Sequence, residues 1–233
     1  ADSCIGGKSS INTKTVKNLI GNIYPPQSVF VDTDFVLTLP EADVLGGLAE
    51  AAKICFCKSS IEFEGFLRFG SMSTPENLDA MLPYVLDIKK WFIQVDEFDK
   101  AERKQLNFGH TFGHALEVGS DYGIPHGLSV ASGMRAALFF ESQTRVLSGV
   151  EQQLFEYTSM LVRSIAGRWP VSAIDWNKYS IAFNGDKKHG VSDYCLILPN
   201  SIGGVRVQYI PKSETTLKKI IDAQKMALSG ETK

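Results

Sequence analysis

A series of helical patterns fills most of the chain and constrains its fold more than any other feature. Glu41–Cys57 is rich in Ala and Leu, and Pro40 suits the first turn of a helix there. Within Pro75–Phe98, apolar residues recur every three or four positions. Similar patterns predict further helices over Arg103–Val118, Leu128–Leu147, Val150–Ala166 and Ser213–Leu228. The sequence therefore predicts a mainly α fold.

A small amount of sheet accompanies the predicted helices. Tyr194–Leu198 and Val205–Ile210 are β-type runs on either side of a turn that contains Pro199 and two glycines, which predicts a β-hairpin. Ser28–Asp32 is a short β-type run, and the first 26 residues are expected to be loop with one short helix. No internal repeat interrupts this order.

Composition excludes several classes of protein. The 233 residues carry a net charge of −2 and no basic stripe, so no nucleic-acid partner is expected. No apolar run reaches the ~18 residues of a membrane span, and no signal peptide opens the chain. The cysteine spacing matches neither a disulfide framework nor a zinc ribbon. We expect no membrane partner, a cytoplasmic location and four reduced thiols, namely Cys4, Cys55, Cys57 and Cys195.

Three of the four histidines lie close together in the sequence. His110 and His114 are four residues apart and share one helix face, and His126 follows a Gly-Ile-Pro turn. Neutral imidazole is the commonest protein ligand of zinc-like metals. The alternative is that these histidines are ordinary polar residues of a helix. Their clustering beside glycines favours a metal site.

Glu50 is the best candidate for a carboxylate ligand of that metal. It lies among small and apolar residues of a predicted helix, so it is expected to be partly buried and to need a partner. Lys53 is three residues further on and shares its face. A simple Glu–Lys helix pair is the alternative interpretation.

Several cations occur where an anion could be held. Lys8 follows two glycines, and Arg103 precedes Asn107 by four residues. Lys187 and Lys188 lie in a turn-like stretch before the hairpin. Each charge alone is typical of solvated surface, but together they indicate a pocket for phosphate or carboxylate.

Five segments resemble motifs of the 3-dehydroquinate synthase family, within the sugar-phosphate cyclase group. They are Asp2–Lys8, Lys17–Gly21, Gly47–Lys53, Asn107–Glu117 and His126–Gly127. The resemblance extends over nearly the whole chain, and Asn-Phe-Gly-His is its most specific part. It implies a helical C-terminal domain of the dehydroquinate synthase type over residues 36–233. Residues 1–35 would be a remnant of the NAD-side domain and a linker.

The resemblance also implies a set of site residues. Glu50, His110 and His126 would hold zinc, or cobalt in its place. His114 would face the substrate phosphate instead, which corrects an interpretation from spacing alone. Lys53 and Lys89 would lie near the reacting hydroxyls.

Further residues are implied to hold the anionic groups and the cofactor. Lys8, Asn18, Asn107 and His114 would contact phosphate or carboxylate, with Arg103 on the carboxylate. One of Lys187 and Lys188 would reach the phosphate. Asp2 would lie beside the nicotinamide of NAD, with Lys8 and Lys17 also on the cofactor side, and the catalytic set would be Lys53, Lys89, Asn107 and His114.

The implied activity is that of a lyase of the shikimate pathway, which makes aromatic amino acids. A phosphorylated seven-carbon keto-sugar acid would be cyclised to 3-dehydroquinate with loss of phosphate, using bound NAD for a transient oxidation. Zinc would polarise the reacting oxygen as a Lewis acid, and NAD would carry the hydride. The resemblance also implies a homodimer.

Three departures from the family pattern leave alternatives open. The chain opens inside a motif, so it is expected to lack most of the NAD-binding half and to turn over no substrate alone. Leu128 stands where a Glu is usual, and Cys4 where a Ser is usual. The alternatives are a deoxy-inosose or epi-valiolone synthase, a metal-dependent polyol dehydrogenase, or a non-catalytic helical domain. Arg103 favours an acid substrate over the first of these.

Overall fold

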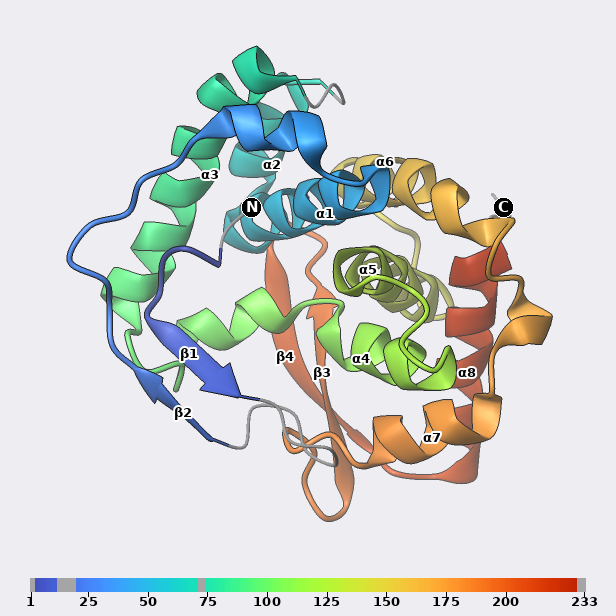
Figure 1. Cartoon of the computed structure of the whole chain (residues 1–233). Helices are drawn as coiled ribbons and strands as arrows, with labels where there is room; N and C mark the ends of the chain where they lie inside the picture. The colour runs from blue at the N-terminus through green and yellow to red at the C-terminus, as the bar shows by residue number, and fades with distance from the viewer. Residues whose placement is uncertain (1–2, 12–19, 71–73, 230–233) are drawn as a thin grey trace.

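The protein is a bundle of helices with two small antiparallel sheets, as a computed structural model shows for residues 3–11, 20–70 and 74–229 (Figure 1). No helix within these ranges is both long and apolar enough to cross a lipid bilayer. The α-helices are α1 (Glu41–Lys58), α2 (Ser60–Leu67), α3 (Pro75–Val95), α4 (His110–Gly119), α5 (His126–Ser142), α6 (Gly149–Ala166), α7 (Trp176–Asn184) and α8 (Glu214–Ser229). The 3₁₀ helices are η1 (Thr33–Thr38), η2 (Glu102–Asn107) and η3 (Val171–Ala173).

Helix α5 is the centre of the core. It packs against α1, α4, α6, α8 and the hairpin strand β3, and Figure 1 shows it nearly end-on among its neighbours. Almost all of its side chains are buried, including Leu128, Met134 and Leu138. A helix that is apolar on every side can be stable only when other elements surround it. Each fully buried Leu or Met contributes about 1.5–3 kcal/mol to this packing.

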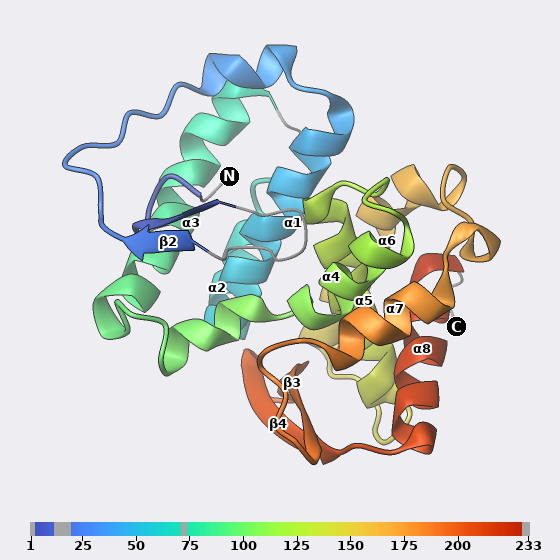
Figure 2. The same cartoon turned by 60° about the horizontal axis from the view of Figure 1, so that its bottom comes forward.

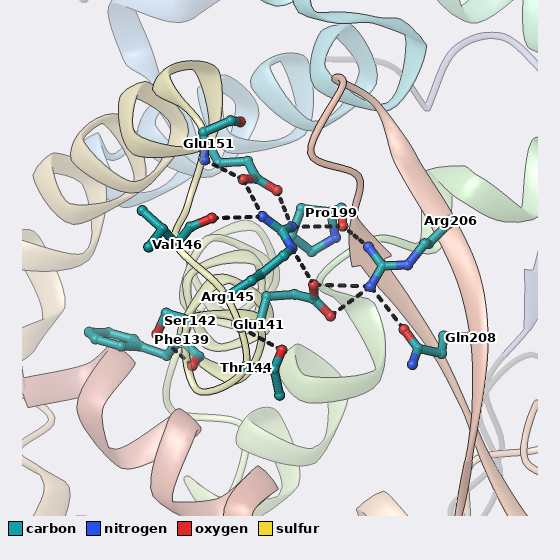
Figure 3. A network of polar contacts seen from close by, with 11 residues as sticks. Phe139, Glu141, Ser142, Thr144, Arg145, Val146, Glu151, Pro199, Arg206 and Gln208 are labelled. Carbon is teal, nitrogen blue, oxygen red and sulfur yellow. Dashed lines mark hydrogen bonds and ion pairs between the residues drawn. The ribbon is translucent and has the colours of Figure 1, made fainter.

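An ion-pair network connects the end of α5 to α6 and to the C-terminal hairpin (Figure 3). Glu141 accepts from Arg145 and from Arg206, and Arg145 also binds the fully buried Glu151. Glu151 in turn accepts the backbone N–H of Ser148 and closes the capping box that begins α6. The network therefore fixes the hairpin against the helical core.

The two sheets are separate hairpins. Strand β1 (Lys8–Ile11) pairs with β2 (Ile20–Ile23), with Lys8 opposite Ile23. Strand β3 (Asp193–Pro199) pairs with β4 (Val205–Pro211), and β3 buries its side chains against α5. Figure 2 shows β3 and β4 beneath the helices, on the same side as α7 and α8.

Most of the predicted elements are confirmed. Four α-helices and the C-terminal hairpin lie where the pattern placed them, and Ser213 Oγ accepts the N–H of Thr216 at the start of α8. The helix expected over residues 128–147 begins earlier, at His126, and ends at Ser142. The sequence pattern missed α2 and α7, which are short.

Three local predictions are wrong. The helix expected over Arg103–Val118 is two elements, η2 and α4, because Gly109 adopts a left-handed backbone with φ 76° between them. The run Ser28–Asp32 is irregular and forms no strand. The described part of the first 26 residues holds the β1–β2 hairpin and no helix.

Candidate metal centre and anion pocket

A cavity of about 500 Å³ opens where α1, η2 and the first turns of α4 and α5 meet the β1 loop. Eight of the sequence-predicted site residues line it: Lys8, Glu50, Lys53, Lys89, Arg103, Asn107, His110 and His126. These residues come from six elements, namely β1, α1, α3, η2, α4 and α5, and the fold brings them to one cavity. Ser3 and Asp43 line the cavity as well and were not predicted.

The crossing of α1 and α5 sets the position of the carboxylate against one histidine. A Cβ at Gly127 would lie 2.4 Å from Gly46 Cα, so the two backbones meet without side chains between them. Glu50 lies one helical turn after Gly46, and His126 immediately precedes Gly127. As a result, Glu50 Oε1 is 3.4 Å from His126 Nε2.

Glu50 presents one carboxylate oxygen with no hydrogen-bond partner. Lys53 Nζ donates to Glu50 Oε2, which agrees with the expected pair. Glu50 Oε1 is buried and accepts no hydrogen bond, although His110 Nε2 lies 3.7 Å away. A buried polar atom without a partner is rare and costs free energy unless an ion or water is bound there.

The two histidines that face this oxygen have their ring orientation fixed from behind. His110 Nδ1 lies 3.2 Å from the backbone oxygen of Phe108, and His126 Nδ1 lies 3.0 Å from Glu117 Oε1. Both partners are acceptors, so Nδ1 carries the proton in each ring. In the neutral rings the lone pair is therefore on Nε2, the atom that faces Glu50.

These three atoms fit a divalent transition metal. In a tetrahedral zinc site with bonds of about 2.0–2.2 Å, ligand atoms are about 3.3–3.6 Å apart. The separations of 3.4 and 3.7 Å around Glu50 Oε1 approach this spacing. The donors are one carboxylate oxygen and two imidazole nitrogens, which is a set that zinc or cobalt accepts.

The pKa values in this cluster reflect competition between burial and charge. Burial disfavours the charged carboxylate, but Lys53, His126 and His110 outweigh it and hold the pKa of Glu50 well below its usual range. Burial and the charge of Lys53 hold the pKa of His110 well below its usual range. The carboxylates of Glu117 and Glu50 raise the pKa of His126 to about 9. A metal ion would displace that proton, so metal binding releases protons here.

His114 also lies in the cluster. Ligand atoms of His110, His114 and His126 all fall within 4.8 Å of one another, and the rings of His114 and His126 are stacked with centroids 5.6 Å apart. His114 does not line the 500 Å³ cavity, whereas the other two histidines do. Its assignment to the phosphate, in place of the metal, stays a prediction.

The cationic side chains of the pocket contact groups of the protein itself. Lys8 Nζ donates to Asp99 Oδ2 at 2.6 Å. Arg103 donates to the backbone oxygens of Gly6 and Glu97 at 2.9 and 2.7 Å, so it fastens the Gly-Gly-Lys loop to the segment after α3. The carboxylate role predicted for Arg103 would use its remaining N–H groups.

The remaining predicted residues are not brought to the cavity or lie outside the described residues. Lys188 pairs with Asp186 at 2.6 Å, and neither it nor Lys187 lines the cavity. Asp2, Lys17 and Asn18 fall outside the residues that the structure describes.

Two contacts of the candidate site were not predicted from the sequence. Glu117 closes the predicted motif, but nothing assigned it to His126; it lies seven residues after His110 and thus on the same helix face, which is the signal that could have revealed it. Asp99 meets Lys8 across 91 residues of sequence, and no local pattern predicts such a pair.

Comparisons with known proteins settle the family. Residues 47–189 match the family model described as 3-dehydroquinate synthase C-terminal. The chain belongs to the 3-dehydroquinate synthase family. Residues 1–45 match the model described as 3-dehydroquinate synthase N-terminal. The resemblance that the motifs indicated is thereby confirmed.

Curated relatives of the family agree over most of the chain. A 3-dehydroquinate synthase of Helicobacter pylori (strain P12) is 34% identical over 221 residues, which are 93% of this chain and 62% of the relative. One from Campylobacter concisus is 33% identical over 223 residues, again 62% of its length. The chain therefore spans about three fifths of the relatives it matches.

Solved structures show the same fold. A 2-deoxy-scyllo-inosose synthase complexed with carbaglucose-6-phosphate, NAD⁺ and Co²⁺ superposes with a TM-score of 0.78 at 21% identity, covering 97% of this chain and 62% of that one. A 2-epi-5-epi-valiolone synthase from Streptomyces hygroscopicus with NAD⁺ and Zn²⁺ bound gives 0.75 at 20% identity, with the same coverage. The predicted fold class is confirmed.

Proposed function

We propose that this chain forms the metal- and substrate-binding part of a 3-dehydroquinate synthase of the shikimate pathway. Such a lyase converts a seven-carbon keto-sugar acid phosphate into 3-dehydroquinate and releases phosphate. The observation that carries the proposal is the buried, unpartnered Glu50 Oε1, which faces the Nε2 atoms of His110 and His126 on the wall of a cationic cavity. The 34% identity to a curated synthase supports it.

The charge of the cavity supports an acidic substrate that carries phosphate. Its wall has four cationic side chains and two carboxylates, which are Lys8, Lys53, Lys89 and Arg103 against Asp43 and Glu50. The ion pair of Lys8 with Asp99 reduces this excess from two positive charges to one, and a bound divalent metal would raise it to three. A phosphate carries about −1.5 to −2 near neutral pH and a carboxylate adds one more negative charge. An acid phosphate therefore matches the cavity better than a neutral sugar.

The side chains that line the cavity would bind different groups of the substrate and the metal. Glu50, His110 and His126 would hold the metal, which when bound acts as a Lewis acid on a substrate oxygen. Lys53 keeps Glu50 Oε2 engaged, so that Oε1 stays directed at the two imidazoles. Arg103 holds the Gly6 backbone against the cavity and leaves N–H groups for a carboxylate. Lys89, buried on the same wall, is proposed near the reacting hydroxyls.

The cofactor, location and assembly complete the proposal. NAD is bound in the two solved structures named above, and it would supply the hydride transfer. Asp2, Lys8 and Lys17 are proposed on the cofactor side, and Asn18, Asn107, His114 and one of Lys187 and Lys188 on the anionic groups of the substrate. Zinc as the resident metal, a cytoplasmic location and a homodimer are proposed from the family resemblance.

The direct test is phosphate release by the full-length protein that contains this chain. Purified protein with NAD and zinc should release phosphate from the seven-carbon acid phosphate, and His110→Ala should abolish the release. A hexose 6-phosphate and a seven-carbon keto-sugar phosphate without the carboxylate serve as competing substrates. Faster release from either one would favour another sugar-phosphate cyclase, and no release from any of the three would contradict the proposal.

A further inference from the structure

Glu117 is a buried carboxylate next to the metal centre to which neither the family motif nor the proposed chemistry assigns a role. Its side chain is only 5% exposed, and its Oε1 lies 3.0 Å from His126 Nδ1. The opposite nitrogen of the same ring, Nε2, lies 3.4 Å from Glu50 Oε1. Glu117 and Glu50 thus hold the imidazole of His126 between them.

His126 depends on such a partner more than His110 does. The side chain of His126 is 48% exposed and belongs to the first residue of α5, so fewer neighbours restrain its ring by packing. The side chain of His110 is 13% exposed and is enclosed by its neighbours. An exposed imidazole that must present one nitrogen to a metal needs a fixed acceptor at the other nitrogen.

The position of Glu117 is fixed by the close contact of α4 with α5. A Cβ at Gly133 would lie 2.0 Å from Gly109 O, and one at Gly113 would lie 2.8 Å from Ser129 O. The two helices therefore meet backbone to backbone, with no side chains between them at this contact. This close contact places Glu117 on α4 within hydrogen-bond distance of His126 on α5.

We propose that Glu117 is a positioning residue that holds His126 with Nδ1–H donated to the carboxylate and the Nε2 lone pair directed at the metal. This inference rests on the metal site of the proposed function. Histidine ligands of metals commonly donate their second N–H to a carboxylate, and loss of that partner weakens metal affinity about 10–100-fold. Glu117→Ala is therefore expected to raise the dissociation constant for zinc by that factor.

The test is a chelator-competition titration with zinc at one fixed pH, together with the absorption spectrum of the Co²⁺ form. Glu117→Gln keeps the size of the side chain and an acceptor oxygen, so it should lose less affinity than Glu117→Ala. Glu141→Ala is the matched control, because Glu141 is equally buried but binds Arg145 and Arg206 far along α5 (Figure 3). The control should lower the thermal midpoint of the metal-free protein and leave the zinc affinity unchanged.

The possible results distinguish the role proposed for Glu117 from the existence of the metal site. The inference is supported if both Glu117 variants lose zinc affinity, Glu117→Ala more than Glu117→Gln, and if the Co²⁺ spectrum changes. Wild-type affinity in Glu117→Gln and Glu117→Ala overturns it while the metal site stands. An equal loss in Glu141→Ala also overturns it, because the effect would then follow from stability alone. A wild-type protein that binds neither zinc nor cobalt overturns both proposals.

Discussion

Replacing Gly127 by alanine should damage the fold and the metal centre together. The added Cβ would lie 2.4 Å from Gly46 Cα and 2.5 Å from Gly46 O, both backbone atoms that cannot rotate away. Carbon atoms pack at about 3.5–4.0 Å, so α1 and α5 must separate by about 1 Å. That separation would also move Glu50 away from His126.

The expected loss follows from two opposing effects. Overpacking of a tight contact costs about 1–3 kcal/mol, whereas replacing a helical glycine by alanine gains at most about 1 kcal/mol. The net loss should be about 1–2 kcal/mol. For a chain of this size that lowers the thermal midpoint by about 2–8 °C. Zinc affinity should fall as well, because ligand distances in metal sites lie within about 0.2 Å of their standard values.

Urea denaturation and zinc titration of Gly127→Ala measure both effects. Gly149→Ala is the control, because nothing lies within 4 Å of its added Cβ and its stability should change by no more than about 0.5 kcal/mol. A Gly127→Ala protein as stable as wild type, with wild-type zinc affinity, would refute the close crossing of α1 and α5.

Three further predictions concern the framework. Burial raises the pKa of Glu151, but the hydrogen bond from Arg145 outweighs burial and lowers this pKa below 4.5. The stability that ionised Glu151 contributes above about pH 4.5 should therefore be lost as the pH falls through the lowered pKa. Urea midpoints measured across the acid range should fall less steeply in Glu151→Gln than in wild type, and identical profiles would contradict this. Gly109→Ala places a side chain at φ 76° and 2.8 Å from backbone atoms, and should cost about 2 kcal/mol or more in urea; a neutral change would disprove the left-handed junction. Phe63→Ala empties a fully buried site and should cost about 3–5 kcal/mol, while Ile61→Ala, 76% exposed, should change stability by under about 0.5 kcal/mol; equal effects would contradict the core assignment.

The sequence predicts the parts of this fold that depend on local patterns. The period of α3 and the alternation of the C-terminal hairpin are properties of neighbouring residues, so they can be recognised without a tertiary structure. The break at Gly109 cannot, because residues 103–118 keep a helical pattern across it and one backbone conformation decides the outcome. The β1–β2 hairpin depends on pairing between strands and carries little alternation of its own. The domain boundary at residues 35 and 36 stays a prediction.

The same distinction between local pattern and tertiary contact applies to the candidate site. His110, His126 and Glu50 were selected by residue type and motif, and the fold brings all three together. The partners that hold them are tertiary contacts, such as Glu117 behind His126. Neither Lys187 nor Lys188 lines the cavity, and the contact of one of them with phosphate stays a prediction.

The central claim is that Glu50, His110 and His126 bind one divalent metal ion. Elemental analysis of the purified chain, loaded with zinc and then dialysed, tests it most directly. We predict one zinc per wild-type chain and none in His110→Ala that remains folded by circular dichroism. Zinc retained at one per chain in folded His110→Ala would contradict the claim.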